Sequence, residues 1–291
     1  MVAFLFPGQG SQEVGMGKEL FAKPAGKEVL AEAAKLGWKK FVPEIPAEEL
    51  SKTAVAQPAI FLVEWAGFLI AKEQGEPKAV AGHSLGEFAA LAAAGVLDWP
   101  TAFKLVLLRG ELMEEAAKKQ PGGMLAVLGL PGEKVEGVAE ESGCFMANIN
   151  APGQVVLAGD PSALGRAEKL AQERGGKAVR LAVAGAFHSP FMREAAQRFA
   201  QALEELVFRA PKITFVSSAS GEVEKDPERI REILKAQMTA PVLWAKTMET
   251  LAAVGVEEAW EVGPGQVLTR LGRRITQRVR FRALAEVLGN V

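Results

Sequence analysis

The chain has 291 residues, with 34 lysines and arginines against 35 aspartates and glutamates, and a single cysteine. The net charge of −1 argues against nucleic acid as the main partner, because phosphate binding needs a net basic face. Cys144 has no second cysteine to pair with, which excludes an intrachain disulfide and a thiolate metal cluster, and we expect neither a metal ion nor a cofactor.

The first elements along the chain indicate a cytoplasmic protein. The segment from Met1 to Pro7 has no basic residue and is broken by proline, so we expect no signal peptide. The most apolar stretch, Pro58–Ala71, contains Glu64 and is too short to span a bilayer, so we expect no membrane segment.

A buried strand is predicted over Val2–Phe6, followed by the glycine-rich loop Pro7–Gln12. Glycines there allow backbone N–H groups to approach a ligand closely. The spacing does not match the dinucleotide fingerprint, which needs G-x-G-x-x-G and an acidic residue about 20 positions later. A long apolar helix is predicted over Ala54–Lys72.

A short strand, Ala79–Ala81, runs into Gly82-His83-Ser84-Leu85-Gly86, and an alanine-rich helix follows. This order is typical of a nucleophile elbow, in which two glycines permit a sharp turn and the serine hydroxyl stands at its tip. The G-x-S-x-G string alone is weak evidence, but the flanking strand and helix strengthen it. The sequence therefore predicts Ser84 as a nucleophile.

Asp98 can cap the next predicted helix, which runs to about Lys119 and contains Arg109. The residues three and four positions away from Arg109 are Val106, Leu112, Leu105 and Met113, so no acid on the same helix can pair with it. A buried guanidinium without an anion is costly. Either a distant acid pairs with Arg109 or it binds an anionic ligand such as a substrate carboxylate.

Residues 122–184 predict a small domain with the element order βαββαβ, the split-βαβ pattern called ferredoxin-like. The loop from Asn150 to Gly153 joins its second and third strands. We expect this domain to be inserted into a larger α/β domain formed by residues 1–121 and 185–291. The predicted elements of the insert are Met124–Leu130, Pro131–Ser142, Cys144–Ile149, Gln154–Ala158, Pro161–Arg174 and Ala178–Val183.

Helices and strands resume after the insert. The predicted elements are Pro190–Leu206, Ile213–Ser217, Pro227–Ala236, Val242–Val254, Glu258–Val262 and Gln266–Arg278.

A serine nucleophile needs a base, and the chain has two histidines. His83 adjoins Ser84 inside the turn, where its side chain should point away from the hydroxyl, so His188 is the predicted base. Asp98 and Asp160 lie between Ser84 and His188, as a triad acid would, but Asp98 reads as a helix cap and Asp160 lies in the insert. A carbonyl oxygen could take the place of the acid.

Several motifs in order resemble the malonyl-CoA:acyl-carrier-protein transacylases of type II fatty-acid synthesis and the acyltransferase domains of polyketide synthases. The likeness covers almost the whole chain. The matching segments are Phe6–Gln12, Gln57–Ala59, Gly82–Glu87, Leu107–Met113, Asn150–Gln154, Ala186–Ser189, Gln237–Trp244 and Glu261–Gly265.

This resemblance implies an α/β-hydrolase-like large domain with a ferredoxin-like insert, and it implies roles for particular residues. Ser84 would be the nucleophile and His188 the base, oriented by the backbone carbonyl of Gln237. The N–H groups of Gln9 and Leu85 would form the oxyanion hole. The residues assigned to substrate binding are Arg109, which would bind the malonyl carboxylate, Gln57 and Asn150.

The implied reaction is ping-pong transfer of malonyl from malonyl-CoA to holo acyl carrier protein by a protein that we expect to be a monomer. Carrier proteins of this pathway are acidic, and Val262–Ala285 is rich in arginine and lacks acids. Arg270, Arg273 and Arg274 are predicted to contact carrier protein or CoA phosphates, although a solvated helix face would look the same. The alternatives are a serine thioesterase of the same fold, a polyketide acyltransferase and an inactive scaffold.

Overall fold

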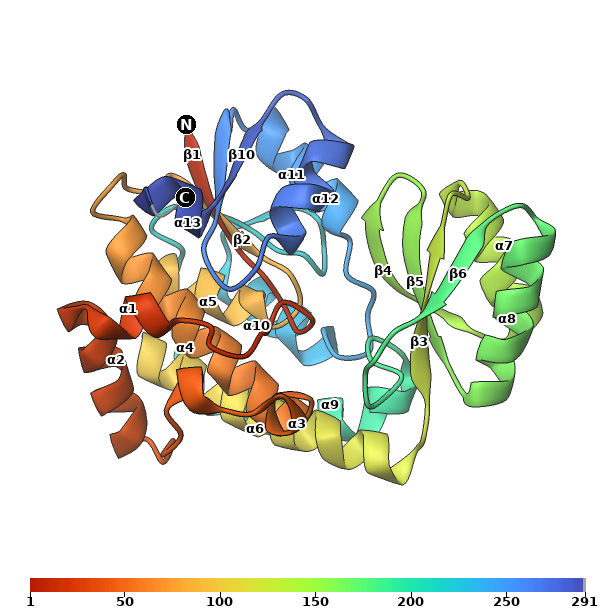
Figure 1. The fold of residues 1–291 in the computed structure, drawn as a ribbon, viewed down its shortest axis with the longest axis horizontal. Helices are drawn as coiled ribbons and strands as arrows, with labels where there is room; N and C mark the ends of the chain where they lie inside the picture. Colours follow the sequence, from red (N-terminus) through yellow and green to blue (C-terminus); the bar gives the residue numbers. More distant parts are fainter. Residues whose placement is uncertain (290–291) are drawn as a thin grey trace.

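The computed structural model describes residues 1–289, and its mixed α/β architecture agrees with the predicted class. Two separate sheets form its framework (Figure 1). The larger sheet has six strands in the order β10-β9-β1-β2-β7-β8, and the smaller has four in the order β4-β5-β3-β6. The four-stranded sheet with α7 and α8 lies to one side of the rest of the molecule (Figure 1).

The large sheet is parallel except for its edge strand β8. Its strands are β1 (Val2–Phe6), β2 (Ala79–Gly82), β7 (Thr214–Val216), β8 (Val223–Glu224), β9 (Glu258–Glu261) and β10 (Arg280–Ala283). Side chains alternate between the two faces of a strand, so Phe4 and Phe6 pack into one apolar cluster while Ala3 and Leu5 pack into another. Helices cover both faces, as a parallel sheet requires.

The helices around the six-stranded sheet pack against it or against one another. They are α1 (Lys18–Ala22), α2 (Pro24–Lys35), α3 (Ala47–Leu50), α4 (Thr53–Ala71), α5 (Gly86–Ala93), α6 (Trp99–Lys119), α9 (Arg193–Glu204), α10 (Pro227–Ala236), α11 (Trp244–Ala253), α12 (Val267–Ile275) and α13 (Leu284–Leu288), with 3₁₀ turns at Val42–Glu44 and Pro190–Met192. The last two helical predictions were too long: α11 begins at Trp244, and α12 ends at Ile275.

Helix α4 corrects the expectation that the most apolar stretch is too short to span a bilayer. It has 19 residues from Thr53 and is long and apolar enough to cross a membrane by length and composition alone. However, 83% of its most apolar window is buried inside the protein, against α2, α5 and α6, as in the core helix of a globular protein. The helix predicted over Ala54–Lys72 agrees with the observed one to within one residue at each end, and the apolar stretch Pro58–Ala71 understates its length because the helix starts five residues before Pro58.

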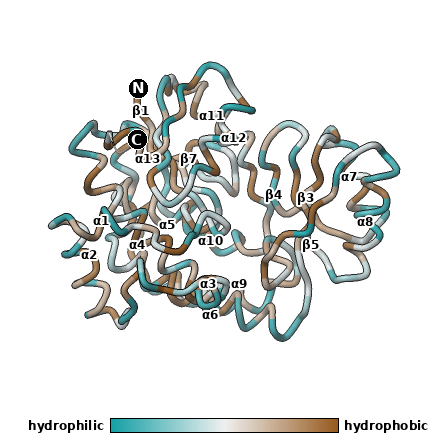
Figure 2. Tube along the Cα trace, in the orientation of Figure 1, coloured by the Kyte–Doolittle hydropathy of each residue, from teal (hydrophilic) through white to brown (hydrophobic). Residues whose placement is uncertain are grey.

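The small sheet has the predicted βαββαβ order and its own apolar cluster. Its elements are β3 (Gly123–Leu128), α7 (Gly132–Ser142), β4 (Phe145–Ala151), β5 (Gln154–Gly159), α8 (Pro161–Glu173) and β6 (Lys177–Arg180). Hydrophobic residues follow the strands, and hydrophilic residues cover the outer turns of α7 and α8 (Figure 2). Asn150 lies within β4 rather than in the predicted loop, and β6 stops at Arg180 rather than Val183.

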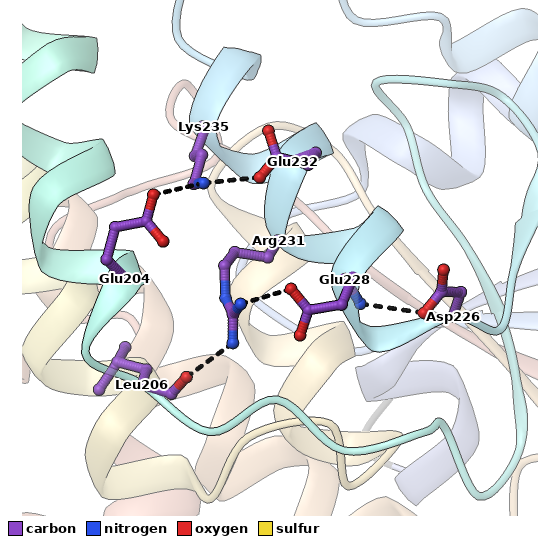
Figure 3. A network of polar contacts seen from close by, with 7 residues as sticks. All are labelled: Glu204, Leu206, Asp226, Glu228, Arg231, Glu232 and Lys235. Carbon is purple, nitrogen blue, oxygen red and sulfur yellow. Dashed lines mark hydrogen bonds and ion pairs between the residues drawn. The ribbon is translucent and has the colours of Figure 1, made fainter.

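Hydrogen bonds and ion pairs join segments that are distant in the sequence. Ile149 and Ala147 of β4 exchange backbone hydrogen bonds with Val242, which joins the small sheet to the segment before α11. Separately, α9 and α10 are held together by polar contacts (Figure 3). In these, Lys235 of α10 bonds Glu204 of α9, and Arg231 donates to the carbonyl of Leu206.

Candidate active site

Ser84 occupies the turn between β2 and α5 with a positive φ of 53°. The turn is tight because its backbone segments touch. A Cβ on Gly86 would lie 2.1 Å from the carbonyl oxygen of Phe6, and a Cβ on Gly82 would lie 2.0 Å from the carbonyl carbon of Gly86. Both positions therefore require glycine, as the elbow pattern predicted.

The Ser84 hydroxyl meets the imidazole of His188, with 2.7 Å between Oγ and Nε2. His188 is buried, and its Nδ1 lies 3.0 Å from the carbonyl oxygens of both Gln237 and Ala240. Carbonyl oxygens only accept hydrogen bonds, so the proton sits on Nδ1 and the lone pair of Nε2 faces Ser84. Burial, with added repulsion from Arg109 and His83, lowers the pKa of His188 to about 3. The imidazole is therefore neutral at neutral pH, as a base must be.

No carboxylate orients this histidine in the described part of the chain. Asp98 caps α6 by accepting from the N–H of Thr101, and Asp160 caps α8 through Ser162 and Ala163. Backbone carbonyl oxygens occupy the place of a triad acid at Nδ1 of His188. One belongs to Gln237, and the other, from Ala240, was not predicted from the sequence. His83 turns away from the Ser84 hydroxyl and bonds Asn150, with 2.9 Å between Nε2 and Oδ1.

Arg109 is 1% exposed, and its guanidinium lies against the serine. Nη2 donates to Oγ of Ser84 and to Oε1 of Gln237, each over 3.1 Å, while Nη1 donates to Oε1 of Gln57 over 2.8 Å. Among the described residues no carboxylate lies within ion-pair distance of it, and its Nε has no partner. Burial lowers its pKa to about 10, which still leaves it charged at neutral pH.

The two predicted oxyanion-hole residues flank the serine. Leu85 follows it at the first residue before α5, and Gln9 lines the same pocket from the loop after β1. Within the described residues, neither backbone N–H donates to another protein group. The Gln9 side chain bonds Thr53 and accepts from Gln57.

Ser84, His188 and Gln9 line a pocket of about 170 Å³ between the two sheets. Gln57, Asn150 and Asn148 line it as well, and the buried Oδ1 of Asn148 has no hydrogen-bond partner in the described part of the chain. No cluster of three or more histidine, cysteine or acidic side chains that could hold a metal is found between residues 1 and 289.

The three predicted surface arginines, Arg270, Arg273 and Arg274, all lie on α12 but make different contacts. Arg274 donates to Gln154 of the small sheet, and Arg273 donates to the carbonyl of Phe281 and faces Glu286 at 3.8 Å. Arg270 lines a separate open cavity. The structure thus brings Ser84, His188, Arg109 and Gln237 together and leaves this arginine group outside the pocket.

Sequence reasoning missed a buried acid beside the serine. Glu87 of α5 is fully buried and accepts hydrogen bonds from Nε2 of Gln237 at 2.6 Å and from the hydroxyls of Ser217 and Ser218. A signal existed, because Glu87 is the one charged residue in the helix Gly86–Ala93.

Comparison with known proteins places this geometry in a family. The sequence model of a protein family described as the acyl transferase domain matches residues 3–291 of this chain. The malonyl CoA-acyl carrier protein transacylase of Salmonella typhimurium is 41% identical, over 98% of this chain and 96% of its own. An acyl carrier protein S-malonyltransferase from Vibrio cholerae superposes with a TM-score of 0.91 at 38% identity, over 97% and 96% of the two chains.

A malonyl-transacylase solved in complex with a type II polyketide acyl-carrier protein gives a TM-score of 0.92 at 37% identity, over 100% of this chain and 99% of its own. The match therefore extends over both sheets and the pocket between them. The chain belongs to the acyltransferase family, among the malonyl-CoA:acyl-carrier-protein transacylases.

Proposed function

We propose that this protein transfers the malonyl group of malonyl-CoA to the phosphopantetheine thiol of acyl carrier protein, through a malonyl ester on Ser84. The single observation that carries the proposal is that the Ser84 hydroxyl touches two groups at once. It lies 2.7 Å from Nε2 of His188 and 3.1 Å from Nη2 of Arg109. A base and a cation beside one nucleophile suit an acyl group that ends in a carboxylate.

In the first half-reaction His188 takes the proton of Ser84 as Oγ attacks the thioester carbonyl. The N–H groups of Gln9 and Leu85 stabilise the oxyanion, which is consistent with their having no protein acceptor among the described residues. The carbonyls of Gln237 and Ala240 stabilise the imidazolium that forms. The protonated His188 then gives its proton to the departing CoA thiolate.

In the second half-reaction the roles reverse. His188 accepts the proton of the phosphopantetheine thiol, the thiolate attacks the ester, and Ser84 leaves with the proton returned. Arg109 holds the malonyl carboxylate throughout by two charge-assisted hydrogen bonds. Gln57 holds the guanidinium from behind through Nη1, and Asn150 keeps His83 at the pocket wall.

The same proposal covers the architecture. Residues 1–121 and 185–291 form the α/β-hydrolase-like catalytic domain, and residues 122–184 form the ferredoxin-like insert. The strand order β4-β5-β3-β6 and the separate apolar cluster support this division. We place the protein in the cytoplasm as a monomer that needs no cofactor, with malonyl-CoA and the holo carrier protein as its partners and fatty-acid synthesis as its pathway.

Of the three arginines that the sequence suggested for contact with the carrier protein, we propose only Arg270. Arg270 forms no ion pair with a described residue, whereas Arg273 faces Glu286 and Arg274 bonds Gln154. Arg270 is therefore the cation best able to meet an acidic partner or a CoA phosphate.

A transfer assay tests the activity. Purified protein is incubated with malonyl-CoA and holo carrier protein, and the carrier is weighed by mass spectrometry. A malonylated carrier supports the proposal. Release of free malonate and CoA with an unmodified carrier would instead identify a thioesterase.

A further inference from the structure

The proposed reaction leaves one buried charge beside the nucleophile without a role. Glu87 is fully buried on the first turn of α5, and Arg109 is buried on α6. They do not touch. Gln237 separates them, and its side chain is itself 2% exposed.

The Gln237 amide is held at both ends. Its Oε1 accepts from Nη2 of Arg109 over 3.1 Å, and its Nε2 donates to Oε2 of Glu87 over 2.6 Å. The remaining Nε2 hydrogen goes to the backbone carbonyl of Ser84 over 3.1 Å. A guanidinium can only donate and an ionised carboxylate can only accept, so these charges fix which way the amide points.

Reversing the amide would aim N–H groups at Arg109 and an oxygen at Glu87. Both contacts would become repulsive in a buried site, where electrostatic interactions are strong. Ser217 and Ser218 donate to Glu87 from the far side and hold the carboxylate in place. Burial raises the pKa of Glu87, and these donors oppose that shift; the charge of Glu87 in turn raises the pKa of Arg109 against the larger effect of burial.

We propose that Glu87 is a positioning residue for acyl selection: it holds the Gln237 amide so that Arg109 is presented to the carboxylate of the acyl group on Ser84. This inference rests on the proposed function. It adds a residue whose carboxylate bonds neither the Ser84 hydroxyl nor the guanidinium and acts through Gln237.

The test uses Glu87→Gln, which keeps the volume and removes the charge. The variant is expected to lower the ratio of malonyl to acetyl transfer about tenfold, the effect of losing one hydrogen bond to a charged group. An unchanged or higher ratio would overturn the proposal. Glu87→Asp keeps the charge but withdraws it from Gln237, and it should lower the ratio by a smaller factor.

A control variant separates this role from the general effect of replacing a buried glutamate with glutamine. Glu64→Gln changes another fully buried glutamate, which lies on α4 and has no hydrogen-bond partner among the described residues. Its malonyl-to-acetyl ratio should equal that of the unmodified protein. If Glu64→Gln lowers the ratio as much as Glu87→Gln does, the positioning role is refuted.

A double-mutant cycle shows whether Glu87 acts through Gln237. In a Gln237→Ala background, Glu87→Gln should cause little further loss of selectivity, whereas additive losses would contradict the proposal. A crystal structure of Glu87→Gln gives a readout that needs no activity. It should show the Gln237 amide or the Arg109 guanidinium displaced, and unmoved side chains would overturn the inference even if malonyl transfer itself were absent.

Discussion

Ser84 and His188, joined by a 2.7 Å contact between Oγ and Nε2, both have left-handed backbone conformations, with φ of 53° and 55°. They are the two non-glycine residues with positive φ between residues 1 and 289. Each conformation has an energetic cost, and the two residues are the proposed nucleophile and the proposed base. The fold thus holds local backbone strain where the Ser84 hydroxyl and the His188 imidazole meet.

The strain at Ser84 can be measured as stability. Ser84→Gly should unfold with a free energy about 1 kcal/mol higher than Ser84→Ala, because glycine adopts positive φ without steric cost. Urea denaturation of the two inactive variants measures the difference. Equal stabilities would show that the turn stores no strain at this position.

The pH dependence of acylation follows from the lowered pKa of His188. Because the pKa is about 3 rather than 6.5, the imidazole of the free protein stays unprotonated well into the acidic range. The rate of the first acylation turnover should therefore be nearly constant on acidification through pH 6.5, until other groups intervene. Rapid-quench measurement with malonyl-CoA tests this, and an acid limb centred at 6.5 would contradict it.

The lowered pKa of His188 also makes the stability of the fold depend on pH, although it leaves the acylation rate nearly constant. Below pH 6.5 the unfolded chain binds a proton at His188 that the folded chain does not bind until about 3. Folding therefore becomes less favourable across that window as the pH falls. His188→Gln lacks this proton and should lose less stability on acidification than the unmodified protein, as measured by denaturant unfolding at several pH values. Parallel losses in both proteins would rule out this linkage.

Arg109→Ala should reduce malonyl transfer more than acetyl transfer. Loss of two charge-assisted hydrogen bonds to the carboxylate is expected to lower kcat/KM for malonyl-CoA about 100-fold, while acetyl-CoA has no carboxylate to lose. Arg198→Ala is a suitable control, because Arg198 is an exposed arginine that pairs with Glu115. Unchanged selectivity in Arg109→Ala would remove the carboxylate-binding role.

Arg270→Glu tests the contact with the carrier protein. The substitution should raise KM for the holo carrier several-fold and weaken its salt dependence, while formation of the malonyl ester from malonyl-CoA persists. Steady-state transfer at two ionic strengths measures both effects. Carrier kinetics that match those of the unmodified protein would exclude Arg270 from the docking surface.

The sequence predicted those parts of the site that sit in compact motifs. The strand, the two close-packed glycines and the helix around Ser84 lie in one short segment. The local sequence pattern was therefore sufficient to predict the elbow. His188 followed because only two histidines are present. The βαββαβ order around the four-stranded sheet was also predicted, since each element shows its own hydrophobic period.

The remaining features depend on tertiary contacts that leave no local pattern. The Ala240 carbonyl reaches His188 from a distant segment, and any residue type has a carbonyl. The bridge from Arg109 through Gln237 to Glu87 joins α6 to the residue after α10 and then to α5. The helices α1, α2 and α3 were not predicted either. Helices α1 and α3 have five and four residues, too few to show a helical period, whereas α2 has 12 residues with Val29 and Ala33 buried on one face and could have been predicted.

Peptide mapping of the protein after brief exposure to malonyl-CoA examines the chemistry most directly. A malonyl ester should appear on the peptide containing Ser84, disappear when holo carrier protein is added, and be absent from Ser84→Ala. A malonyl group on any other residue, or transfer to the carrier that survives in Ser84→Ala, would contradict a serine ester as the intermediate.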